Sequence, residues 1–196
     1  MILPIVAYGD PVLRKECVNI DPDYPNLKEL ILNMKETMYN ASGVGLAAPQ
    51  IGKAIRLFLI DASPFAEDED LDESDRETLK TFNKVFINAQ ILEEEGEEWA
   101  FNEGCLSIPD VRQDVYRQPK VTIEYQDENF KKHTEVLDGL AARVFQHEYD
   151  HIEGILFTDK LSTLKKRLIK KKLENISKGK INADYRMRFP NLKKRK

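Results

Sequence analysis

The stretch HEYDH places His147 and His151 four residues apart, with Glu148 directly after the first histidine. Side chains four positions apart lie on one face of a helix, so both imidazoles could bind the same metal ion. Glu148 is rotated by about 100° from His147 on that helix and could reach a metal-bound water without being a ligand. The alternative is a surface helix with two unrelated histidines. Because the chain holds only three histidines and two have this spacing, the pattern favours a metal site.

A catalytic metal site also needs a third protein ligand and one open coordination position. One class of metallopeptidase has a histidine six residues after the second one, but Phe157 occupies that position here. Another class uses a downstream glutamate, and the only helical candidate is Glu174, among lysines typical of a solvated helix. Cys105 is the third candidate, because it lies between a glycine and a leucine in a tight segment.

The spacing of apolar residues predicts three helices that could position these side chains. The first covers 27–43, and the second covers 140–154, which contains HEYDH, with Asp138 near its start. The third covers 161–179 and is capped by Ser162 or Thr163. We expect the buried line of this third helix to run through Leu164, Leu168 and Ile169.

Two apolar runs rich in β-branched and aromatic residues, 54–62 and 84–96, predict strands, and residues 121–138 predict a hairpin. Between the two strands, residues 63–83 carry eight acids within positions 67–77, so we expect a solvated, mobile loop. Strands that do not alternate with helices favour an α+β fold with largely antiparallel β-sheets.

The chain shows no repeat or linker, so we expect a single domain. The candidate site lies in residues 1–162, and residues 163–196 form a basic C-terminal helix and tail. Residues 160–196 hold 15 Lys or Arg against two acids, whereas the whole chain has 30 basic and 34 acidic residues. Such a segment suits a polyanion, and nucleic acid is the obvious candidate. The alternative is a solvated surface helix.

The composition also bears on the compartment. No apolar run approaches the roughly 18 residues of a membrane span, and the N-terminal MILPIVAYGDP lacks the basic region of a secretory signal. The two cysteines, Cys17 and Cys105, do not make a disulfide framework. We therefore expect a cytoplasmic protein with no membrane partner.

Three motifs resemble the signature motifs of bacterial peptide deformylases and occur in the same order: GVGLAAPQ (43–50), EGCLS (103–107) and QHEYDHIEG (146–154). The resemblance extends from about Gly9 to the end of the helix at 164–177. It implies the peptide deformylase fold, in which antiparallel sheets surround a central helix carrying HEYDH, with a further helix at the C-terminus. Enzymes of this family remove the formyl group from the N-terminal formyl-methionine of newly synthesised polypeptides.

Within residues 1–162, the resemblance implies a catalytic metallohydrolase domain that binds one metal ion per chain. The implied ligands are Cys105, His147 and His151. A thiolate is softer than a third imidazole or a carboxylate, and two histidines and a cysteine with an open position suit Fe²⁺ or Zn²⁺. Family members commonly use ferrous iron, so we expect Fe²⁺ as the native ion and Zn²⁺ as the alternative.

The same resemblance assigns roles in catalysis and substrate binding. Metal-bound water would attack the formyl carbonyl, with Glu148 as general base and then general acid. Gln50 and the backbone N–H of Leu106 would stabilise the oxyanion. The small residues of GVGLAAPQ would let a peptide approach the backbone closely. The residues implied to line the substrate pocket are Val44, Gly45, Gly104 and Leu140.

Two residues leave alternatives open. Arg143 lies one helical turn before His147, where many relatives carry an apolar residue, and this indicates a methionine pocket of altered shape or polarity. Cys17 could join the three ligands in a closed structural zinc site, although it lies 88 residues before Cys105. Besides nascent formyl-methionyl polypeptides, the basic C-terminal helix indicates a ribosome contact through ribosomal RNA, and we expect no DNA partner.

Overall fold

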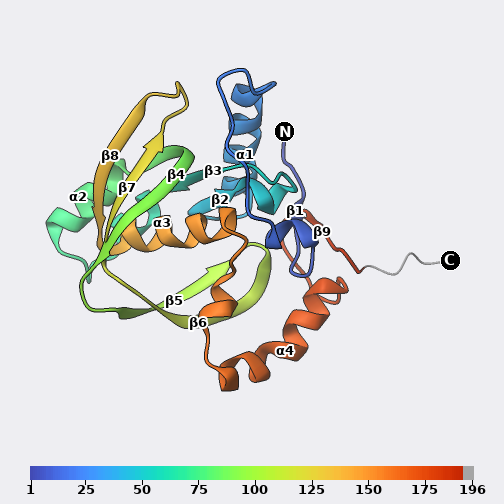
Figure 1. Ribbon diagram of the computed structural model, residues 1–196. Coiled ribbons are helices and arrows are strands. Elements are labelled where there is room, and N and C mark those ends of the chain that lie inside the picture. Colours follow the sequence, from blue (N-terminus) through green and yellow to red (C-terminus); the bar gives the residue numbers. More distant parts are fainter. Residues whose placement is uncertain (192–196) are drawn as a thin grey trace.

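A five-stranded antiparallel sheet is the largest layer of the computed structural model, which describes residues 1–191 (Figure 1). Its strands run in the order β2 (Gly45–Ala47), β3 (Leu57–Asp61), β4 (Asn83–Glu95), β7 (Lys120–Gln126) and β8 (Lys132–Asp138). The remaining strands are an antiparallel pair, β5 (Trp99–Cys105) and β6 (Ile108–Arg117), and a parallel pair, β1 (Ile5–Val6) and β9 (Met187–Arg188). The two predicted strands and the predicted hairpin are confirmed, whereas β1, β2, β5, β6 and β9 were missed.

Among residues 1–191, four α-helices pack against the sheets, and one of them, α3 (Gly139–Ile152), lies between the five-stranded sheet and the β5–β6 pair (Figure 1). The α-helices are α1 (Leu27–Asn40), α2 (Glu73–Thr81), α3 (Gly139–Ile152) and α4 (Thr163–Ser177). Short 3₁₀ helices cover Pro11–Arg14, Ala48–Ile51, Ser63–Glu67 and Phe157–Lys160. Helix α3 crosses the centre of the molecule, with the five-stranded sheet on one side and the β5–β6 pair on the other (Figure 1). The α+β prediction is confirmed; among the helices in residues 1–191, none has the length and apolar character to cross a membrane.

Strand β3 lies between two apolar layers, which explains its uninterrupted apolar sequence. Phe58 and Ile60 join the core beneath α3, whereas Leu57 and Leu59 join the core beneath α1. Successive side chains of a strand point to opposite faces, so both sets can be buried at once. Phe145 of α3 meets Phe58 edge to face, with ring centroids 5.3 Å apart. Helix α3 is therefore held on the sheet by aromatic packing.

The ends of α3 follow the signals in the sequence. Asp138 caps the first turn, where its Oδ1 accepts a hydrogen bond from the N–H of Gly139 at 2.7 Å. Gly154 follows the last turn with φ of +72°, and a Cβ there would lie 2.8 Å from the backbone of Arg14. The predicted helix around HEYDH is confirmed at both ends.

Residues 63–83 contain two helices, so the prediction of a loop was wrong, whereas the predicted exposure of the acids to solvent is confirmed. They contain a 3₁₀ helix and α2, whose N-cap Asp72 accepts a hydrogen bond from the N–H of Asp75 at 2.8 Å. All eight acids of positions 67–77 are exposed, while Leu79 and Phe82 are buried in the core. A helix can pack on the core through a single apolar stripe. In this segment the stripe consists of few residues among many acids, so the composition did not indicate it.

The C-terminal helix α4 is confirmed, with Ser162 as its N-cap, but its buried face differs from the predicted one. Leu164 and Leu168 are 67% and 73% exposed. The buried apolar positions are Ile169, Leu173 and Ile176. Two apolar stripes run along this helix, and only contact with the rest of the protein selects the buried one. The predicted tail extends to residue 196, and its residues 192–196 lie outside the described part of the chain.

Candidate metal centre

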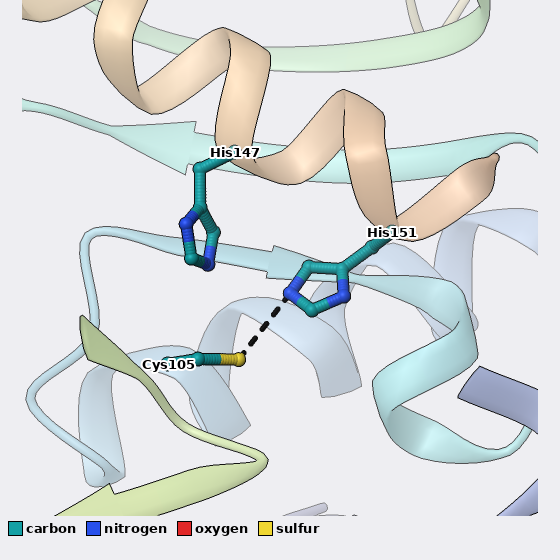
Figure 2. Close-up of side chains that lie close together, drawn as sticks. All are labelled: Cys105, His147 and His151. Carbon is teal, nitrogen blue, oxygen red and sulfur yellow. Dashed lines mark hydrogen bonds between the residues drawn. The ribbon is translucent and has the colours of Figure 1, made fainter. Parts of the chain in front are cut away.

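Helix α3 and the end of β5 bring three candidate ligands together (Figure 2). His147 and His151 project from one face of α3, with their ring centroids 5.1 Å apart. Cys105 approaches from the opposite side, and its Sγ lies 3.4 Å from Nε2 of His151. One ligand atom from each residue lies within 4.8 Å of the other two. The three residues predicted to bind a metal thus form one cluster.

The cluster has the size and chemistry for one metal ion. Bonds of about 2.0–2.3 Å to nitrogen and sulfur put two ligands of a tetrahedral ion roughly 3.5 Å apart. The observed distance between Sγ of Cys105 and Nε2 of His151 is 3.4 Å. Burial lowers the pKa of His151, which favours the neutral imidazole that can offer a lone pair to a cation. These residues fit the metal that the sequence predicts.

The rival ligands lie elsewhere. Cys17 is buried in the apolar core beneath α3, and Glu174 is exposed on α4. Phe157, where another metallopeptidase class has its third histidine, stacks on the ring of His147 with centroids 6.1 Å apart. Within residues 1–191, no further His, Cys, Asp or Glu joins the cluster. A three-ligand set leaves a coordination position open, as a catalytic site requires.

Glu148 lies beside the cluster in a buried position. The residue is 4% exposed, and its Oε2 has no hydrogen-bond partner among the described residues. Burial raises the pKa of its carboxyl group to about 7. Gly45 makes room for this side chain, because a Cβ there would clash with the carboxylate of Glu148. A carboxyl group with this pKa can both accept and donate a proton near neutral pH.

Glu103, which the sequence reasoning missed, connects the two elements that carry the ligands. Its Oε2 lies 2.9 Å from Nδ1 of His147, so the ring donates from Nδ1 and directs Nε2 towards the cluster. Arg117 donates to the same carboxylate from Nε at 2.7 Å and to Asp150 from Nη1 at 2.7 Å. Burial alone would raise the pKa of Glu103, but hydrogen bonds from His147 and Arg117 hold it well below its usual range. A signal existed in the sequence, since Glu103 and Cys105 share one face of a strand.

Arg143 lines the cleft next to the cluster, yet its terminal nitrogens are bound within the protein. Nη1 donates to Glu103 at 3.0 Å and to the carbonyl of Val115 at 3.1 Å, and Nη2 donates to the carbonyl of Trp99 at 2.7 Å. The guanidinium carbon lies 4.5 Å from the centre of the Trp99 ring. The positive charge of Arg143, which the sequence predicts near the methionine pocket, is therefore paired with Glu103 and covered by the ring of Trp99.

The ligand cluster opens into a cleft of about 480 Å³. Of the predicted pocket residues, Val44, Gly45 and Gly104 line this cleft. Leu140 does not line it; this residue lies in the core and borders a small separate cavity beside α2. Val144, one turn further along α3, faces the cleft instead. Other apolar lining residues that the sequence reasoning missed are Phe65, Phe101, Ile108, Val111 and Tyr185.

Gln50 is 1% exposed, and both ends of its amide are engaged. Its Oε1 accepts a hydrogen bond from the N–H of Ala47 at 2.8 Å. Its Nε2 lies 3.5 Å from Sγ of Cys105 and 3.5 Å from Oγ of Ser107. Because the backbone fixes the carbonyl end, the N–H donors of Gln50 point towards the ligand cluster.

Known proteins are similar to this chain in both sequence and fold. The polypeptide deformylase family profile matches residues 2–167. Peptide deformylases of Christiangramia forsetii and Flavobacterium johnsoniae are 72% and 69% identical to it over 194 residues, which cover 99% of this chain and 99% of each relative. The crystal structure of peptide deformylase from Thermus thermophilus superimposes with a TM-score of 0.76 at 38% identity, covering 90% of this chain and 98% of that one. The resemblance of the three motifs is confirmed, and the chain belongs to the polypeptide deformylase family.

Proposed function

We propose that this member of the family removes the formyl group from formyl-methionyl peptides with a metal ion held by Cys105, His147 and His151. The observation that carries the proposal is the meeting of these ligands within 4.8 Å, beside the buried carboxyl group of Glu148. By analogy with the family the ion is Fe²⁺, with Zn²⁺ as the alternative, because a thiolate and two imidazoles suit both. Such an ion supplies Lewis acidity, which polarises a carbonyl and lowers the pKa of water from about 15.7 towards 7.

Glu148 moves the proton in this reaction. Its Oε2 has no partner in residues 1–191, so this atom is available to accept a proton from the attacking water. The carboxyl group then passes the proton to the leaving amine nitrogen. A pKa of about 7 suits a group that must take a proton in one step and give it up in the next.

Gln50 and the backbone N–H of Leu106 stabilise the formyl oxygen as its carbon becomes tetrahedral. Negative charge grows on that oxygen, and losing one donor aimed at it typically costs about 3 kcal/mol. The amide of Gln50 is already oriented by Ala47, so little reorganisation is needed. Backbone at Val44, Gly45 and Gly104 lines the path of the peptide, and the apolar walls of the cleft receive the methionine side chain.

A substrate comparison tests the proposed function. Protein purified without oxygen should contain one iron or zinc ion per chain and should release formate from formyl-Met-Ala-Ser. The acetylated peptide carries one extra methyl group at the reacting carbon, so we expect its kcat/KM to be about 10-fold to 200-fold lower. Cleavage of the Met–Ala bond, or of the free-amine peptide, would instead indicate a metallopeptidase of another kind.

The basic face of α4 is proposed to dock on the ribosome through ribosomal RNA. Its support is the charge of this segment and the exposure of Lys170 and Lys171 on α4. Truncation would expose the buried face of α4, so paired substitution of Lys170 and Lys171 by glutamine is the better test. We expect weaker ribosome co-sedimentation at low salt, since phosphate contacts dominate there. The matched control replaces Lys131 and Lys132, an exposed pair on the hairpin; equal binding by both variants would contradict the proposal.

A further inference from the structure

The segment after α4 returns to the catalytic side of the molecule. The family profile ends at residue 167, whereas this segment covers 178–191. Its strand β9 lies beside β1 (Figure 1), where the N–H of Ile5 donates to the carbonyl of Arg186 at 2.9 Å and the N–H of Ala7 donates to that of Arg188 at 2.9 Å. The C-terminal segment is thus anchored to the N-terminal strand.

Tyr185 is the residue of this segment that reaches the cleft. Its hydroxyl donates a hydrogen bond to the carbonyl of Leu106 at 2.7 Å, across 79 positions of sequence. Its ring is partly buried against the core beneath α1 and lines the cleft. Burial raises the pKa of this phenol, and the nearby Cys105 and Asp110 raise it further, so the hydroxyl keeps its proton and remains a donor.

The turn that Tyr185 contacts is Leu106–Ser107, which joins Cys105 at the end of β5 to the start of β6. Other groups hold the second residue of this turn: the N–H of Tyr8 donates to the carbonyl of Ser107 at 2.8 Å, and Nε2 of Gln50 lies 3.5 Å from its Oγ. Tyr185 holds the first residue, Leu106, by its backbone carbonyl. The turn is therefore fixed by both terminal segments, which pair with each other through β1 and β9.

We propose that Tyr185 is a positioning residue that sets the orientation of the Leu106 backbone and, through it, of the N–H aimed at the oxyanion. The carbonyl and the N–H of Leu106 belong to the two peptide planes that meet at its α-carbon, so holding the carbonyl restricts one of the two dihedral angles that set the direction of the N–H. A preorganised donor stabilises developing charge without moving during the reaction, and a donor free to rotate does not. The inference rests on the proposed deformylase function, because it assigns Tyr185 to that reaction.

Tyr185→Phe removes the hydroxyl and keeps the ring. Losing a whole oxyanion donor costs about 10²–10³-fold in kcat, and a misoriented donor loses part of that, so we expect kcat on formyl-Met-Ala-Ser to fall about 10-fold. The KM, inhibition by the product Met-Ala-Ser and the metal content should stay unchanged, because the interaction is strengthened only in the transition state. The control is Arg188→Gln, which breaks the ion pair between the exposed Arg188 of β9 and the partly buried Asp10 and should keep wild-type kcat.

Three results would overturn the inference. The first is a wild-type kcat in Tyr185→Phe, which would leave the ring as a cleft wall only. The second is a raised KM at unchanged kcat, which would indicate substrate binding. The third is a loss of activity that follows lost metal or a lowered melting temperature, which would indicate a structural role. A wild-type enzyme that releases no formate would refute the proposed function itself, and this inference with it, before any variant is compared.

Discussion

Glu148→Ala should lower kcat for deformylation by about 10³-fold while the metal content stays at the wild-type level. Among residues 1–191, two buried carboxyl groups line the cleft beside the ligand cluster, those of Glu103 and Glu148. Glu103 is already bound to His147 and two arginines, so the alanine removes the carboxyl group that is free to move a proton. Without it, neither the attacking water nor the leaving amine has a positioned proton acceptor or donor. Metal retention is expected because Glu148 is not among the three clustered ligands. Steady-state formate release and elemental analysis measure the two quantities.

Glu174→Ala is the matched control for this prediction. Glu174 is the other glutamate considered as a participant in the site, and it is exposed on α4. Its replacement should change neither kcat nor metal content. If Glu148→Ala kept more than a tenth of the wild-type kcat, another group would have to carry the proton.

Glu103→Ala should destabilise the protein by about 3–5 kcal/mol and weaken metal binding about 10-fold to 100-fold. Glu103 is 4% exposed, and its removal deprives Arg117 and Arg143 of their shared carboxylate, leaving buried positive charge poorly compensated. It also frees Nδ1 of His147, so the ring is no longer oriented towards the ion. Denaturant unfolding measures the stability change, and competition with a chelator measures metal affinity.

Glu94→Ala supplies the comparison, since Glu94 is an exposed glutamate of β4 away from the cleft. We expect it to unfold and bind metal like the wild type, because exposed charges contribute little to stability. Equal stability of Glu103→Ala and Glu94→Ala would show that the arginines find other partners. Normal metal affinity in Glu103→Ala would show that His147 is oriented without the carboxylate.

Much of the candidate metal site could be predicted from local sequence. Two histidines four residues apart lie on one face of a helix wherever that helix is placed, and Asp138 and Gly154 mark its ends. Strands β3 and β4 and the β7–β8 hairpin follow from the same local periodicity. Cys105 as the third ligand depended on the resemblance of whole motifs, because spacing alone left the third ligand open.

Three of the wrong predictions share one cause, since each depends on which surfaces meet. The acidic composition of 63–83 outweighed the few apolar residues that dock it, and α4 offered two apolar stripes of which one is buried. Leu140 and Val144 lie on the same side of α3, yet only Val144 faces the cleft. The spacing of apolar residues along a helix does not indicate which part of the protein those residues will contact.

The sequence by itself determined most of the helices, part of the sheets and the candidate metal ligands, because hydrophobic period and ligand type are local properties. Only the tertiary structure decided that Glu103, Arg117 and Arg143 join β5, β6 and α3 beneath the ligands, and that Tyr185 returns to the turn beside Cys105. Those contacts link residues far apart in the chain. Their energies depend on burial and on hydrogen-bond geometry, which exist only once the chain has folded.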